Sequence, residues 1–155
     1  MLTWLNTRRL LTVVLFLGIF VMALRAVADS DLWWHLAAGD WIRANGSVPR
    51  VDPFSHTVAG QPWIEPGWLP DVLMSLVFER LRYAGLGVLL GCLVTAALAI
   101  DHVLSDAHPF ARAFATLLGA ITSALYWTMR PHLFSFLFFA ATLWILAQHR
   151  RGRRR

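Results

Sequence analysis

The stretch Arg8–His35, "RRLLTVVLFLGIFVMALRAVADSDLWWH", decides the fold, because a long apolar run ends abruptly in acids and tryptophans. Two arginines precede the run, which approaches the ~17–25 apolar residues that a helix needs to cross a bilayer. Basic residues beside an apolar segment favour the cytoplasmic side of a membrane. The stretch therefore predicts a membrane-spanning helix that is followed directly by a polar segment on the outer side.

The composition agrees with an integral membrane protein. The chain has 155 residues, of which 57% are hydrophobic, and its mean hydropathy is +0.55. Residues 29–83 carry four arginines and seven acids (−3), whereas the remainder carries ten arginines and two acids (+8). The arginines flank apolar segments and form no single face, so nucleic acid is not an expected partner. The single cysteine, Cys92, excludes a disulfide or a cysteine-ligated metal within one chain.

Four apolar segments predict an all-α fold with about four transmembrane helices, at residues 10–28, 84–102, 111–127 and 132–148. Arginines before the first and after the last segment place both termini in the cytoplasm, so that residues 29–83 form a long external loop. The first segment also has the form of a signal peptide, with Ala26–Ala28 as the cleavage motif. Its long apolar core favours an anchor that is retained.

Two further helices are expected in the external loop, at residues 31–45 and 68–82. Asp29 or Ser30 can cap the first and Gly46 can end it. The second, expected to begin near Pro70 and end at Gly85, carries a polar stripe at helical spacing, made of Asp71, Ser75, Glu79 and Arg82. A helix with one charged stripe and an apolar face favours the membrane interface over a span.

The acids after the first span are the leading candidates for chemistry. Asp29 and Asp31 could accept a proton from a hydroxyl group or hold a divalent cation, Mg²⁺ or Mn²⁺. His35 lies one turn beyond Asp31 and could pair with it or contact a substrate. The alternative is that both acids only cap a helix, and the spacing alone favours capping.

Other residues allow two interpretations each. Trp33 and Trp34 could stack on a sugar or an isoprenoid chain, or anchor a helix at the interface. Arg25, inside the first apolar segment, could serve a functional site or extend to lipid headgroups. Arg130 and His132 flank a proline on the external side, where a guanidinium could bind a phosphate or merely a lipid headgroup.

Several more acids and histidines have no direction fixed by the sequence. Asp52 precedes a proline and predicts a turn, while His56 and Glu65 could reach a site in the external loop. A second group has metal-ligand spacing but is expected to lie in a solvated cytoplasmic loop: Asp101, His102, Asp106 and His108.

Five segments together resemble a group of bacterial multi-span membrane proteins. They are "DSDLWWHLAAGDWI" (29–42), "VPRVDPFSHT" (48–57), "QPW" (61–63), "WLPDVLMSLVFERL" (68–81) and "RPHLFSFLF" (130–138). The layout of that group is similar to glycosyltransferases of the GT-C superfamily, which use polyprenyl-phosphate-linked sugars. The resemblance covers about residues 12–148, and it implies a multi-pass protein of the bacterial cytoplasmic (inner) membrane.

The resemblance implies roles for particular residues. An acid at the start of the first external loop acts at the catalytic centre of that superfamily, and Asp29 and Asp31 hold this position. The expected reaction moves a sugar from a polyprenyl phosphate to an acceptor hydroxyl at the outer face of the membrane. Their expected place on the outer side, and not a motif of the superfamily, is the reason to expect that Trp34, His35, Arg130 and His132 bind substrate, with Arg130 near the lipid phosphate.

The chain departs from that superfamily chiefly in length, because its members have many more spans. It is therefore expected to be the amino-terminal portion of a larger fold, which other membrane subunits could also complete. A non-catalytic membrane scaffold or lipid-binding protein remains the alternative function. In that case Asp29 and Asp31 are helix caps and the tryptophans are membrane anchors.

Overall fold

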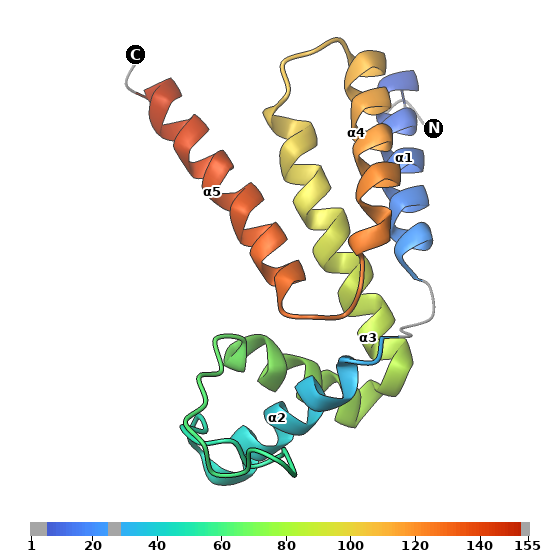
Figure 1. The fold of residues 1–155 in the computed structure, drawn as a ribbon. Coiled ribbons are helices and arrows are strands. Elements are labelled where there is room, and N and C mark those ends of the chain that lie inside the picture. Colours follow the sequence, from blue (N-terminus) through green and yellow to red (C-terminus); the bar gives the residue numbers. More distant parts are fainter. Residues whose placement is uncertain (1–5, 25–28, 153–155) are drawn as a thin grey trace. The chain divides into compact units, whose positions relative to one another are not determined.

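The computed structural model describes residues 6–24 and 29–152, and the fold there is helical (Figure 1). The elements are α1 (Thr7–Ala23), α2 (Leu32–Asn45), α3 (Trp68–Leu104), α4 (Pro109–Ser123), the 3₁₀ turn η1 (Ala124–Tyr126) and α5 (His132–Gly152). The described ranges contain no strand, only an isolated bridge between Val51 and Pro62. The all-α prediction is thus confirmed. Arg25 and the cleavage motif Ala26–Ala28 lie outside the described residues.

The chain forms two compact units. One consists of Met1–Val27 and Gly87–Arg155, and the other of Ala28–Leu86, so α3 contributes residues to both. The helical geometry of α3 breaks at Arg82, where φ is 53° and ψ is −148°. This break falls between the predicted helix 68–82 and the predicted span 84–102. The start at Trp68 and the break at Arg82 agree with the predicted bounds 68–82, whereas Gly85 does not end the helix.

Two helices, α3 and α5, are long and apolar enough to cross a membrane by length and composition. The helices at the other two predicted spans are shorter in the described residues. α1 has 17 residues and α4 has 15, which correspond to about 25 and 22 Å of helix. Large apolar side chains are exposed on α1, α4 and α5, including Leu17 of α1, Phe114 of α4 and Phe139 of α5.

Within the first unit, α1 packs against α4 and against the second part of α3. The ring of Phe20 lies over Gly91, and Phe16 meets His102 edge to face at 5.2 Å. Nδ1 of His102 lies 2.8 Å from Oγ1 of Thr116. The prediction that His102 belongs to a solvated loop was wrong, because α3 continues to Leu104 and turns this side chain towards α4. Its three companions are exposed as expected: Asp101, Asp106 and His108.

In the second unit, α2 packs closely against the first part of α3. Three positions of α2, each four residues apart, face three positions of α3 with the same spacing: His35, Gly39 and Arg43 face Asp71, Ser75 and Glu79. Gly39 is the point of closest approach. A Cβ at this position would collide with the backbone carbonyl of Asp71 and would lie 2.7 Å from Cβ of Ser75.

Replacing Gly39 by alanine should therefore destabilise the second unit, although alanine is the better helix former. We expect a loss of about 1–3 kcal/mol, typical of an overpacked contact, because the obstacle is backbone. Hydrogen exchange of the α2 amides in a mild detergent measures this loss locally. Gly18→Ala is the matched control: its Cβ meets nothing within 4 Å, so it should leave stability unchanged or raised. Equal protection of α2 in Gly39→Ala and the wild type would refute the close contact.

Candidate functional site

The two acids Asp29 and Asp31 lie at the start of α2. The backbone N–H of Asp31 donates to Oδ1 of Asp29 at 2.9 Å, and the hydroxyl of Ser30 is 3.4 Å from Oδ1 of Asp31. Both acids are half-buried. Asp29 thus makes the local backbone contact typical of a residue that initiates a helix. A catalytic or metal-binding role for either acid stays a prediction.

His35 is buried and points towards α3. Its Nδ1 lies 2.8 Å from Oδ1 of Asp71, 36 residues further along the chain. The expected pairing with Asp31 was wrong: these two residues are joined by the helical backbone bond, while the imidazole faces the partner helix. The indole of Trp34 covers the ring, with centroids 3.7 Å apart. His35 is therefore held on two sides, by a carboxyl group and by an aromatic plane.

Asp71 is completely buried in the first turn of α3. Burial raises the pKa of this carboxyl above its ordinary value of 3.8, and the hydrogen bond from His35 opposes that effect. Its second oxygen, Oδ2, has no hydrogen-bond partner among the described residues. A buried carboxyl oxygen without a partner is costly when ionised, so the pair with His35 matters to the stability of this unit.

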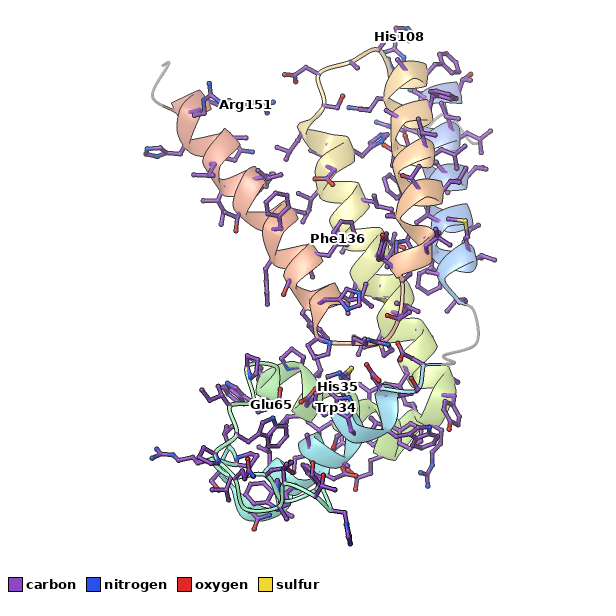
Figure 2. All side chains as sticks on the ribbon, viewed as in Figure 1. Trp34, His35, Glu65, His108, Phe136 and Arg151 are labelled. Atoms are coloured by element: carbon purple, nitrogen blue, oxygen red, sulfur yellow. The ribbon has the colours of Figure 1, made fainter. Side chains whose placement is uncertain are left out.

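Glu65 adds a second buried carboxyl to the same cluster. Its Oε1 accepts the backbone N–H of Gly67 at 2.8 Å, which turns the side chain inwards just before α3 begins. Burial is the main cause that raises the pKa of Glu65 above 4.5; nearby Asp71 raises it further, and His35 lowers it. Figure 2 shows Glu65, His35 and Trp34 gathered in one part of this unit. We call His35, Glu65 and Asp71 the buried triad.

A second set of polar contacts continues the α2–α3 contact towards solvent. Ser75 donates to Asp40 at 2.6 Å and accepts from Arg43 at 2.9 Å. Arg43 also forms ion pairs with Asp40 and Glu79. These side chains border a cavity of about 460 Å³ that Phe78 and Arg82 also line. The guanidinium of Arg43 already serves three partners, so this set acts first as a clamp between the helices.

The predicted phosphate-binding residues belong to the other unit. Arg130 is half-buried in the turn before α5, and Nε2 of His132 lies 2.9 Å from the carbonyl oxygen of Tyr126. This contact joins His132, the first residue of α5, to the last residue of η1. The structure therefore brings Asp29, Asp31, Trp34 and His35 together in one unit and Arg130 with His132 in the other. Binding of a phosphate by these two residues stays a prediction.

The remaining acid and histidine candidates between α2 and α3 are Asp52 and His56. Oδ1 of Asp52 accepts the backbone N–H groups of Phe54 and Ser55 at 2.8 and 3.0 Å, which confirms the predicted turn. The side-chain hydrogen bond of Ser55, together with the backbone N–H groups of Ser55 and Phe54, lowers the pKa of Asp52 below 3.8. His56 is exposed.

A divalent cation at the start of α2 would have few protein ligands. The described residues gather no group of three or more histidine, cysteine or acidic side chains suited to a metal ion. Magnesium can be held by one or two carboxylates with several waters. Asp29 and Asp31 meet that minimum, although Asp29 already accepts a backbone hydrogen bond.

Comparisons with protein-family profiles, curated proteins and solved structures find no match to this chain. The site must therefore be interpreted from its own geometry.

The residue that sequence reasoning missed is Asp71. Its stripe with Ser75 and Glu79 is expected from the sequence on a helix at the membrane interface, with no partner helix assigned to the stripe. The signal that could have corrected this is the matching stripe in α2, where His35, Gly39 and Arg43 repeat the same spacing of four. Two complementary stripes of this kind indicate a helix pair with polar side chains between the helices.

The buried triad predicts how stability depends on pH. Because folding raises the pKa of Asp71 and Glu65, the folded protein keeps protons that the unfolded chain releases above about pH 4. The free energy of unfolding should therefore fall as the pH rises from the pKa values of these two carboxyl groups in the unfolded chain to their raised values in the folded protein. Five of the eight tryptophans lie in Ala28–Leu86, so tryptophan fluorescence during thermal unfolding in detergent reports mainly on this unit.

Asp71→Asn removes one of the two titrating groups and should flatten this pH dependence. Asp106→Asn, which changes an exposed acid, serves as the charge-matched control and should leave the slope unaltered. A pH profile of Asp71→Asn that superimposes on the wild type would show that Asp71 is not buried as described.

Proposed function

We propose that the chain is a glycosyltransferase-like module of a bacterial cytoplasmic membrane. In this proposal α1, the second part of α3, α4 and α5 cross the bilayer, both termini are cytoplasmic and residues 29–83 are external. The arginines at the ends of the chain favour this orientation. The apolar side chains exposed on α1, α4 and α5 support contact of these helices with lipid. The second unit is then the part that meets the outer surface of the membrane.

The distribution of side chains in the second unit supports an interfacial location for α2 and the first part of α3. Charged and polar groups of the buried triad are inside, whereas large apolar residues are exposed. The exposed set includes Trp33, Trp68, Leu69, Leu81 and Tyr83. Tryptophan and tyrosine are the residues enriched at membrane–water interfaces, and leucine suits the adjoining acyl chains.

The observation that carries the enzymatic proposal is the way Asp29 and Asp31 are held. They stand directly before the first turn of a helix that His35 and Gly39 fix against α3, and Asp29 accepts the backbone N–H of Asp31, so their carboxylates have a defined position. Fixed carboxylates outside a span suit a base that acts on a substrate presented at the membrane surface. His35 acts in this scheme as a positioning residue.

The proposed reaction transfers a sugar from a polyprenyl phosphate to an acceptor alcohol. The acceptor oxygen forms a bond to the anomeric carbon while the bond from that carbon to the phosphate oxygen breaks. Asp31 takes the proton of the acceptor hydroxyl, and the polyprenyl phosphate leaves with the electron pair. A bound Mg²⁺ or Mn²⁺ would supply positive charge near the phosphate, with Asp29 and Asp31 as its ligands.

One observation favours a second candidate, the non-catalytic scaffold or lipid-binding protein. Asp29 accepts the N–H of Asp31, which is what a helix-initiating residue does in any protein. In this case the acids and the buried triad only orient α2, and the exposed tryptophans anchor it.

Sugar transfer by the purified protein in nanodiscs separates the two candidates. The substrates are undecaprenyl-phosphate-linked hexoses and pentoses labelled in the sugar, and the readout is the release of undecaprenyl phosphate together with labelled product. Asp31→Asn should lower transfer by about 10²–10⁴-fold, as expected for removal of a general base, while inserting normally. Asp106→Asn is the control and should retain full transfer. Undiminished transfer by Asp31→Asn, or none by the wild type, would contradict the proposal.

A further inference from the structure

The cavity beside the clamp between α2 and α3 carries a balanced set of charges. Its volume of about 460 Å³ falls within the range of ~300–1,000 Å³ that small-molecule sites occupy. Its lining includes two arginines and two acids, whose charges cancel: Arg43, Arg82, Asp40 and Glu79. All of these residues belong to Ala28–Leu86, so the second unit forms the cavity by itself.

The clamp leaves hydrogen-bonding capacity on both acids of the cavity. Oδ1 of Asp40 accepts from Ser75 and Arg43, and Oε2 of Glu79 pairs with Arg43. The other oxygen of each carboxylate accepts no hydrogen bond from the residues that the structure describes. Both acidic side chains are more than half exposed, so a ligand in the cavity can reach these oxygens.

Arg82 is the cation of the cavity that the clamp does not use. No ion pair joins it to an acid in the described part of the chain, and its Cζ lies 5.5 Å from the centroid of the Phe78 ring. A guanidinium at this distance from an aromatic face is attracted to the ring. The contact holds the group at the cavity while its N–H donors stay available to a ligand.

The backbone of Arg82 is strained. Its φ of 53° and ψ of −148° lie in a region that residues with a side chain rarely adopt, whereas glycine adopts it readily. Strain of this kind persists only where the surrounding structure enforces it, and it is concentrated at functional sites. A glycine would make the same break in α3 at a lower cost, which indicates that the side chain of Arg82 has a use of its own.

The balance of charges indicates the class of ligand. A phosphate or a carboxylate would lie beside two acids, and an ammonium group beside two arginines, so each would meet like charge. A neutral sugar avoids both costs. Its hydroxyl groups donate as well as accept, which suits carboxylate oxygens and guanidinium N–H groups together, and Phe78 adds an apolar surface for the C–H groups of a sugar ring.

We propose that this cavity binds a neutral saccharide, whose hydroxyl groups donate to Asp40 and Glu79 and accept from Arg82. Asp40 follows Asp31 by nine residues, which corresponds to about 14 Å along α2. A sugar in the cavity is therefore held apart from the acids at the start of α2. The site goes beyond the proposed sugar transfer, because binding here requires neither Asp31 nor a polyprenyl phosphate.

Saturation-transfer NMR of the protein in phosphatidylcholine nanodiscs, which contain no sugar, tests the proposal. The probes are the methyl glycosides of glucose, galactose and mannose, together with the 6-phosphate and the 2-amino derivative of each hexose. At least one neutral glycoside should bind, and it should bind more tightly than its two charged counterparts. Arg82→Gln should weaken its affinity by at least about tenfold, since a charged hydrogen-bond donor is lost.

Two further variants separate binding from folding. Arg80→Gln removes the same charge two residues away, outside the lining, and should keep the wild-type affinity. Arg82→Gly removes the guanidinium and the backbone strain together, so it should melt no lower than the wild type and still lose binding.

Three results would overturn the proposal: no binding of the three neutral glycosides at millimolar concentrations, tighter binding of a charged counterpart, or an equal loss in Arg82→Gln and Arg80→Gln. No polyprenyl donor is present in these measurements. A failure of the saccharide site is therefore distinguishable from a failure of the proposed transfer.

Discussion

The contact between α2 and the first part of α3 is the constraint on which the second unit depends. At Gly39 the two backbones approach so closely that no side chain fits between them. This approach brings His35 within hydrogen-bond distance of Asp71 and lets Arg43 reach Glu79. The order of these contacts along both helices is the same, so a shift of one helix by a residue would break all of them together.

The interior of this unit is more polar, and its surface more apolar, than a protein surrounded only by water would favour. Asp71 and Glu65 are buried at a cost that appears in their raised pKa values, while Trp33 and Leu81 are exposed. The proposed contact of this unit with a membrane surface would explain why large apolar side chains such as Trp33 and Leu81 are exposed while the acids are inside. The first unit also exposes large apolar side chains, such as Leu17 of α1.

Local patterns predicted the helices well, because caps and periodicity are encoded by neighbouring residues. Gly46, with φ of 62°, ends α2 as expected, and the all-α class is confirmed. Burial could not be predicted in the same way, because it depends on which helix faces which. The stripe headed by Asp71 was assigned to an interfacial helix without a partner helix, and His102 was assigned to a loop although α4 covers it. The roles of Asp29 and Asp31 depend on a substrate, and neither periodicity nor packing defines one.

A double-mutant cycle between His35 and Asp71 tests the central claim most directly. Hydrogen exchange of the α2 amides gives the local free energy of opening for His35→Ala, Asp71→Ala and the double variant. Residues in direct contact typically show coupling of ~0.5–3 kcal/mol. For a buried, hydrogen-bonded pair we expect a value above about 1 kcal/mol, with the double variant less damaged than the sum of the single variants. Additive effects, with a coupling near zero, would contradict the account that this pair holds α2 against α3.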